Sequence, residues 1–400
     1  MLLALFIGLL FALSLISARL EKTVLTAPIL FTLAGILLWP AIGAAGLHLD
    51  SAGLLHLAEI GLVLLLFTDA SRTDLEVLGD IRALPARLLS VGMLLTILLG
   101  ALAAKLILPQ LSFWEAGILS AILAPTDAGL GQVIVNSPLV PMRVRQALNV
   151  EAGLNDGLSV PFLLFFIAMA VAGEGEASLA RYIWEQLGLG VVAGLGIGLL
   201  GGWLIATAHR AGWIAESFLQ LAVVALPVFC LLVSPPLGAS MFIAAFVAGL
   251  AVQVSFKQAG KHSVEFTEEW GQVLNLAVFF LFGLLIRRDF GSLGVAPFAY
   301  AVASLTVVRM LPVAVSLAGA GLDRRTVAFM GWFGPRGLAS IVLGLVYLEE
   351  EAKLPGEAAT RAAVMATVLL SVFAHGLTAL PGMRWLARCT GSRGETEAGS

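Results

Sequence analysis

Apolar runs of about 20 residues recur along the whole sequence, and a run of that length is enough to cross a bilayer as a helix. Of the 400 residues, 59% are hydrophobic and 12% are charged, whereas soluble domains carry about 25% charged residues. We therefore expect an all-α polytopic membrane protein formed by one integral membrane domain. Hydropathy and helix-breaking residues predict thirteen spans, at 2–18, 24–46, 53–71, 86–108, 113–137, 146–172, 182–208, 213–233, 237–253, 270–287, 293–319, 324–348 and 358–385.

Lysine and arginine gather mainly in the loops on one side of these spans. Because positively charged loops stay in the cytoplasm, we expect the N-terminus outside and a short cytoplasmic tail over 386–400. The low charge of the loops argues against binding of nucleic acid. The two cysteines have no metal-ligand spacing and indicate no disulfide framework.

Short words of the first half return in the second half, in the same order and at nearly the same separation. The pairs are AGI at 34–36 with AGL at 248–250, Pro125 with Pro335, and DGLSVP at 156–161 with HGLTALP at 375–381. An odd number of spans lies between the copies, which predicts two inverted six-helix repeats. We expect one repeat over about 1–172, a linker helix over about 182–208 and the second repeat over about 213–385. Spans two and nine are rich in glycine and alanine and should pack closely.

The fifth and twelfth spans contain proline near their middles, in APTDAGLG at 124–131 and GPRG at 334–337. Proline removes a backbone donor and clashes with the preceding turn, so we expect two broken helices. The Thr126 carbonyl and the Asp127 carboxylate are hard oxygen ligands that suit a small cation. Arg336 could neutralise the negative C-terminal end of a half-helix. The alternatives are a plain proline kink with Asp127 snorkelling, and a helix that begins at the membrane interface with Arg336.

Three polar residues lie in the apolar sixth span. Glu151 and Asn155 are four residues apart and share one helix face, whereas Asp156 is turned about a quarter of a circle away. An unpaired ion is costly in hydrocarbon, so we expect a structural ion pair between Glu151 and Arg309, the other buried charge without a partner. Asp156 then remains to hold either a proton or a metal cation, and this competition is the mechanism of an antiporter.

Asp69 and His375 each allow two interpretations. Asp69 could face the same cavity from the cytoplasmic side, or it could mark the membrane interface beside Arg72 and Asp74. His375 occupies the repeat position of Asp156 and could relay protons, although a lone histidine is more often structural.

Taken together, these blocks resemble the cation–proton antiporter family in its NhaP-like monovalent branch. The resemblance is carried by APTDAGLG at 124–131, VPMRVRQALNVEAGLNDG at 140–157, Arg309, GWFGPRGLAS at 331–340 and VLLSVFAHGLT at 368–378. It implies an NhaA-like antiporter fold with thirteen helices and two broken helices that cross in a six-helix core. It also implies a homodimer in which the core moves against a dimerisation domain in an elevator-like motion.

By the same resemblance, Asp156 is the shared site for proton and cation, and Thr126 and Asp127 contribute ligands. The resemblance also pairs Glu151 with Arg309. An Asn-Asp pair, rather than two acids, looks like the electroneutral branch. One carboxylate that exchanges one proton for one monovalent cation moves no net charge.

The sequence departs from the family pattern at two positions. Ala152 stands where family members often have serine, and Ala128 stands where many have proline. Loss of the serine hydroxyl removes one ligand and leaves the identity of the ion open, and a water could take its place.

We expect an electroneutral Na+/H+ (or Li+/H+) antiporter of the cell inner membrane, with K+/H+ exchange as the alternative. Its partners would be the cation, protons, membrane lipid and a second copy of the chain, without a cofactor. An ion channel, from another class, needs a continuous pore, whereas two broken helices at mid-membrane favour alternating access. An intramembrane hydrolase lacks support because HExxH and GxGD motifs are missing, so an enzyme is not expected.

Overall fold

The structure is a computed structural model that describes residues 2–20, 23–44, 51–72, 83–171, 181, 184–256, 259–349 and 354–390. Within these ranges all regular structure is helical. The last ten residues of the expected cytoplasmic tail, 391–400, and Asp74 beside the third span lie outside the described residues.

Each of the thirteen expected ranges contains at least one helix. The α-helices are α1 (Leu2–Ser14), α2 (Ser17–Leu20), α3 (Ala27–Ala44), α4 (Ser51–Arg72), α6 (Ala83–Arg87), α7 (Met93–Ile107), α8 (Phe113–Ile122), α9 (Ala128–Val135), α10 (Met142–Val171), α12 (Gly190–Arg210), α13 (Glu216–Val233), α14 (Met241–Ser255), α15 (Ala259–Arg288), α16 (Val295–Leu305), α17 (Val307–Ser316), α18 (Arg324–Trp332), α19 (Leu338–Glu349) and α20 (Glu357–Thr390). Short π-helical turns continue α6 into α7 over Leu88–Gly92 and precede α12 over Trp184–Leu189.

Among the described residues, seven helical segments are long and apolar enough to cross a membrane, including Met142–Val171 and Glu357–Cys389. Five further apolar helices are shorter, and α8 and α19 belong to them because each is one half of an interrupted helix. The chain is therefore a multi-pass helical membrane protein.

The eleventh expected span, 293–319, is divided where the sequence predicted one helix. α16 ends at Leu305, and the backbone of the next residue, Thr306, leaves the helical region at φ −106° and ψ −92°. The Thr306 hydroxyl donates to the Val302 carbonyl one turn earlier at 2.6 Å. Threonine that bonds to its own backbone in this way competes with the helical ladder, which accounts for the bend before α17.

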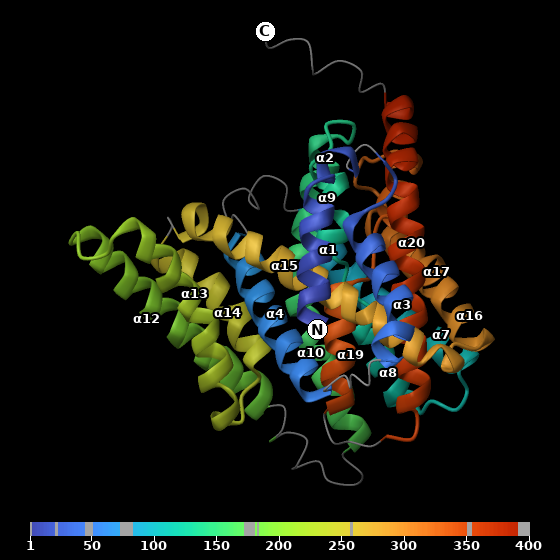
Figure 1. Ribbon diagram of the computed structural model, residues 1–400, viewed down its shortest axis with the longest axis horizontal. Helices are drawn as coiled ribbons and strands as arrows, with labels where there is room; N and C mark the ends of the chain where they lie inside the picture. The colour runs from blue at the N-terminus through green and yellow to red at the C-terminus, as the bar shows by residue number, and fades with distance from the viewer. Residues whose placement is uncertain are drawn as a thin grey trace.

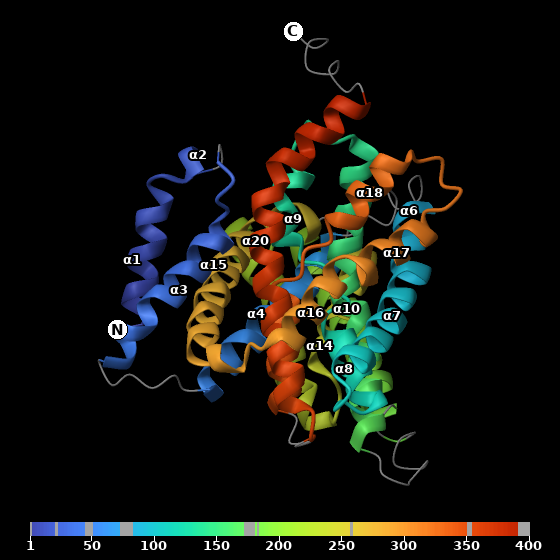
Figure 2. The ribbon, with the colours of Figure 1, turned by 90° about the vertical axis from the view of Figure 1, so that its right-hand side faces the viewer.

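The helices are arranged around the interrupted pairs. In Figure 1, α12, α13 and α14 lie at one end of the molecule, while α10 and α19 lie near its middle. Figure 2 shows α1 and α3 on the flank opposite α6, α7 and α17, with α20 between them. The non-helical segments of the interrupted helices, 123–127 and 333–337, are buried within this bundle.

Glycine sets the closest helix contacts, which confirms the close packing predicted for spans two and nine. A Cβ atom added at Gly35 of α3 would overlap the Phe280 carbonyl of α15, and one added at Gly283 would overlap the Thr32 carbonyl. In α14, Gly249 lies equally close to the backbone of Phe67 in α4. Small residues let helix backbones approach where lipid gives no hydrophobic drive for association.

We predict that Gly283→Ala lowers the free energy of unfolding by about 1–3 kcal/mol, because the added methyl group forces α3 and α15 apart. Thermal unfolding of the purified protein in detergent measures this change. The control is Gly271→Ala in the same helix, where a Cβ atom meets nothing within 4 Å. There the better helix propensity of alanine should leave stability unchanged or raise it by up to about 1 kcal/mol. Equal effects of the two substitutions would contradict the close contact.

Candidate functional site

Two interrupted helices meet inside the bundle. α8 ends at Ile122 and α9 begins at Ala128, while α18 ends at Trp332 and α19 begins at Leu338. Both breaks lie where Pro125 and Pro335 predicted them. The two non-helical segments contact each other directly, because the Asp127 N–H donates to the Pro335 carbonyl at 2.8 Å. The breaks therefore form one site, in which each segment satisfies backbone groups of the other.

Asp127 caps two helices at once. Its Oδ1 accepts the Leu130 N–H at 2.8 Å and so caps α9, while its Oδ2 accepts the Leu338 N–H at the start of α19. Helix N-termini carry partial positive charge, so this buried carboxylate lies between two favourable ends. A Cβ atom at Gly337 would overlap the carboxylate. Glycine at that position is what permits the contact.

Arg336 has the complementary role at a helix C-terminus. The side chain is completely buried, and its Nη1 donates to the carbonyls of Ala124 and Pro125, the latter at 2.9 Å. These carbonyls follow the last residues of α8, where the helix dipole is negative. Arg336 thus lies against the broken helix of the first half, although it belongs to the second break.

His375 is placed at the second break and not beside Asp156. Its Nε2 lies 2.8 Å from the Trp332 carbonyl, the last of α18, and its Nδ1 lies 3.0 Å from Ser371 Oγ. A carbonyl can only accept, so Nε2 donates to Trp332 in the tautomer that carries its proton on Nε2. Nδ1 also lies 3.0 Å from the Ser371 carbonyl, so it faces both an acceptor and a hydroxyl. Ser371 Oγ in turn accepts the Arg336 N–H at 2.6 Å.

Glu151 and Arg309, which the sequence analysis paired, form a buried ion pair between α10 and α17. Arg309 Nη1 donates to Glu151 Oε1 at 2.5 Å, and Nη2 donates to Oε2 at 2.9 Å. The two side chains are 6% and 3% exposed, and two parallel bonds are the strong form of this contact. A Cβ atom at Gly334 would overlap the Arg309 guanidinium. The ion pair therefore also packs against the second break.

The remaining polar atoms of α10 lie beside the first break. Asn155 Nδ2 donates to Thr126 Oγ1 at 2.7 Å. Asn155 Oδ1 and Asp156 Oδ1 are buried and make no hydrogen bond with any described residue. Asp156 is 3% exposed. The Asn155 amide thus joins α10 to the first break at Thr126, and Asn155 Oδ1 and Asp156 Oδ1 still have full capacity to accept.

Asp69 lies next to this group, on α4. Its Cβ is 3.7 Å from the place a Cβ atom would take at Gly153, one helical turn before Asp156. Asp69 and Asp127 are both close enough to interact electrostatically with Asp156. The structure thus brings Asp69, Asp127 and Asp156 into one region, and it keeps Glu151 apart from them in its pair with Arg309.

Two residues of the site were not found from the sequence. Ser371 links Arg336 to His375, and it stands one helical turn before His375 within the block 368–378 already quoted. Asn275 of α15 places its amide against Gly129, where an added Cβ atom would lie 2.6 Å from Nδ2. The available signal was an amide in the apolar run of α15, one helical turn after Gln272.

A sequence model described as sodium/hydrogen exchanger, transmembrane, matches residues 2–385. The K(+)/H(+) antiporter NhaP2 of Shewanella sp. (strain ANA-3) is 27% identical over 66% of this chain and 46% of its own length. The Na(+)/H(+) antiporter 2 of Zygosaccharomyces rouxii is 27% identical over 69% of this chain and 39% of its own. The K(+)/H(+) antiporter NhaP of Alkalimonas amylolytica is 27% identical over 95% of this chain and 66% of its own length. The chain thus spans about half the length of the first curated relatives it matches, 46% of each.

The structure of the sodium proton antiporter MjNhaP1 from Methanocaldococcus jannaschii superposes with a TM-score of 0.76. The match covers 97% of this chain and 99% of that one, at 20% sequence identity. A second structure of that antiporter gives a TM-score of 0.74. At this level of identity the likeness shows a shared fold.

We predict that Glu151→Gln lowers the free energy of unfolding by about 3–5 kcal/mol, because it leaves the Arg309 charge buried without a counter-charge. Thermal melting in detergent is the measurement. Glu185→Gln is the matched control, since Glu185 pairs with Arg181 at 2.7 Å on an exposed face and exposed pairs contribute little. If both variants melted like the wild type, Glu151 would not be a structural partner of Arg309.

Proposed function

We propose, since the chain belongs to the sodium/hydrogen exchanger family, that it is an antiporter which exchanges a monovalent cation for a proton at Asp156. The observation that carries this proposal is that the Asp156 carboxylate has an oxygen free to accept a hydrogen bond or bind a cation. Glu151 is engaged by Arg309, and both oxygens of Asp127 accept backbone N–H groups. Asp156 Oδ1 is buried and accepts no hydrogen bond from the described residues. It can therefore take a proton or a cation directly.

The neighbours of Asp156 fit a site for a small monovalent cation. Asn155, the residue before Asp156, has a free amide oxygen, and its amide nitrogen bonds to Thr126 Oγ1. We propose that these two neutral oxygens are further ligands, since hard cations prefer oxygen. Asp127 and Asp69 add negative potential, and we propose that they complete the cation- and proton-binding group. Asp127 has lone pairs beyond those that its caps use. No cofactor is required for this chemistry.

The expected stoichiometry is one cation for one proton. Asn155, which precedes Asp156, cannot titrate, so one carboxylate changes its occupant in each half-cycle. A cation can bind Asp156 only after the proton leaves, and a proton can bind only after the cation leaves. The two ions therefore cross in opposite directions, and no net charge moves. We propose Na+ or Li+ as the cation, with K+ as the alternative, since relatives named for both ions match the chain.

The proposed architecture has thirteen membrane crossings in two inverted repeats, over about 1–172 and 213–385, with a linker helix over about 182–208. The two breaks at Pro125 and Pro335 occupy equivalent places in these repeats, which supports this division. We further propose a homodimer in the inner membrane, surrounded by lipid, with the N-terminus outside. The apolar residues exposed on α12 and α13, such as Leu199, Trp203 and Phe229, provide a face for the second copy.

In this scheme Arg336 stabilises the contact between the two breaks, and His375 binds the last carbonyl of α18. His375 Nε2 contacts a backbone carbonyl, and Nδ1 faces Ser371. Both ring nitrogens are thus engaged within the second break, which favours a structural part over a proton relay.

We predict that Na+, Li+ or K+ dissipates an imposed pH gradient in everted membrane vesicles, because an antiporter returns a proton for each cation. Side-by-side addition of the three ions measures the preference. Exchange should proceed at the same rate with and without an ionophore that clamps the membrane potential. A rate that depends on the potential would contradict the one-for-one stoichiometry, and cation flux without proton movement would indicate a channel.

We predict that Asp156→Asn abolishes exchange in the same vesicles and leaves the melting temperature close to that of the wild type, because Asp156 Oδ1 supports no other described group. Asp127→Ala is the informative comparison. It removes the caps of α9 and α19, each worth about 0.5–2 kcal/mol, so it should lower both stability and exchange. Exchange retained by Asp156→Asn would place the site elsewhere.

A further inference from the structure

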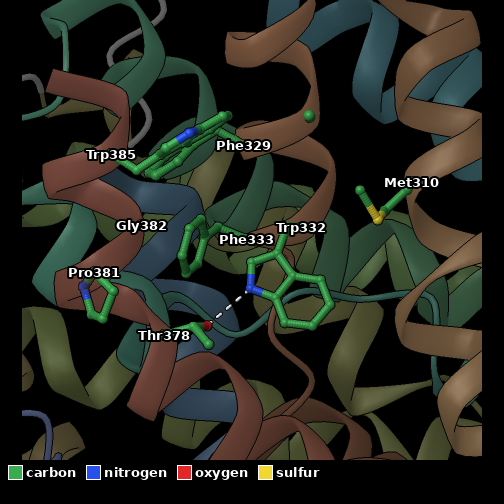
Figure 3. A pocket seen from close by; sticks show the side chains of 9 residues that line it. Met310, Phe329, Trp332, Phe333, Thr378, Pro381, Gly382 and Trp385 are labelled. Carbon is green, nitrogen blue, oxygen red and sulfur yellow. Dashed lines mark hydrogen bonds between the residues drawn. The ribbon is translucent and has the colours of Figure 1, made fainter. Parts of the chain in front are cut away.

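A pocket of about 420 Å³ opens between α17, α18 and α20, beside the second break. Its walls are almost entirely apolar. They are formed mainly by Met310 of α17, by Phe329, Trp332 and Phe333 at the end of α18, and by Pro381 and Trp385 of α20. Figure 3 shows these side chains around one space, with Trp385 beside Phe329 and Met310 on the opposite wall.

The polar atoms at the pocket are already satisfied. Trp332 Nε1 donates to Thr378 Oγ1 at 2.9 Å (Figure 3), and the Thr378 hydroxyl donates to the Ala374 carbonyl at 2.6 Å. The pocket therefore presents aromatic and aliphatic surface without a free donor or acceptor on these two side chains. Such a lining suits a hydrocarbon chain and gives a polar or charged small molecule nothing to bind.

The pocket is open to the surroundings of the helices. Ala328 and Pro381 are exposed, and the Trp385 side chain is 44% exposed. The segments Val295–Ser316 and Glu357–Cys389, which contain Met310 and Trp385, are both candidate membrane spans. We infer that the opening faces the bilayer near its boundary with water, where tryptophan is enriched.

Two exposed arginines continue the faces that line the pocket. Arg325 stands four residues before Phe329 on α18, and Arg388 stands three residues after Trp385 on α20, so each shares a helix face with a lining residue. α18 and α20 run in opposite directions, because Trp332 bonds to Thr378 while Phe329 lies with Trp385. Both arginines therefore lie beyond the same end of the pocket.

Neither arginine forms an ion pair within 4.0 Å with a described carboxylate. The nearest acid in sequence to Arg325 is Asp323, which caps α18 by accepting the Thr326 N–H at 2.7 Å. Hydrogen bonding to Thr326 lowers the pKa of Asp323, and the charge of Arg325 lowers it further. Asp323 thus interacts with Arg325 at longer range, while the Arg325 and Arg388 side chains stay exposed to groups outside the protein.

We propose that this pocket binds one acyl chain of an anionic phospholipid whose phosphate lies against Arg325 and Arg388. The apolar walls take the chain, and the two guanidinium groups take the headgroup. Arginine suits phosphate because its planar fork offers two parallel donors. A zwitterionic lipid would bring a positive amine to the same two cations, so the site should discriminate by headgroup charge.

The test is native mass spectrometry of the purified full chain in detergent, titrated with a phosphatidylglycerol and with a phosphatidylcholine of identical acyl chains. We expect one phosphatidylglycerol to bind about tenfold more tightly than phosphatidylcholine. Equal binding of the two lipids would overturn the proposal, because headgroup charge would then play no part.

Three variants locate the site. Ala328→Trp fills the opening and should weaken phosphatidylglycerol binding by about tenfold, while Arg325→Gln should weaken it by about fivefold, the effect of one basic residue at an anionic surface. Arg210→Gln is the matched control. It removes the same charge from an exposed arginine at the end of α12, a helix that does not line the pocket.

Unchanged binding in Arg210→Gln together with the two losses would support the proposal. Equal losses in Arg210→Gln and Arg325→Gln would instead indicate a diffuse attraction by the charge of the whole protein and overturn the headgroup position. Unchanged binding in Ala328→Trp would overturn the pocket as the site of the acyl chain. Melting temperatures of all variants, measured without added lipid, separate lost binding from lost folding. Arg325 is exposed, so its variant remains informative if the tryptophan variant does not fold.

Discussion

Non-helical backbone inside a membrane needs partners for its N–H and C=O groups. The rest of this structure depends on how the crossing, the contact between the breaks at Pro125 and Pro335, supplies those partners. The Asp127 carboxylate accepts N–H groups at the N-terminal ends of α9 and α19, and Arg336 donates to the carbonyls that follow α8. Each charged side chain thus lies at helix ends of opposite partial charge. Two buried ions are tolerated here because the backbone itself supplies their counter-charges.

The same requirement explains why the acidic residues near the crossing have different partners. Glu151 neutralises Arg309, whose guanidinium packs against Gly334, so this ion pair supports the second break. Asp127 supports both breaks by capping the helix that follows each of them. Asp156 is left with an oxygen that no described group engages. The proposed exchange of ions at Asp156 therefore need not disturb the bonds that hold the helix ends together.

Local patterns in the sequence were enough to predict the helical class, the two breaks and the partner of Glu151. Pro125 and Pro335, each with glycine close by, marked the two breaks, whereas Pro161 and Pro381 lie inside the continuous helices α10 and α20. A buried charge requires a counter-charge, which left Arg309 as the available residue. The bonds across the crossing were not predictable in the same way. The double cap of Asp127 depends on the Leu338 N–H, and the position of His375 depends on the Trp332 carbonyl. Backbone groups carry no residue-specific signal, so only the three-dimensional arrangement reveals such partners.

The partners at the crossing are 211 residues apart in the chain, since Asp127 meets Leu338 and Pro125 meets Arg336. During synthesis, the first break must therefore enter the membrane long before the groups that satisfy it have been made. Until then its free carbonyls and its carboxylate need water, the insertion machinery or a provisional partner in the first half of the chain. The contact between the two breaks thus cannot form until Leu338 has been made, and biogenesis must protect the N-terminal half until then.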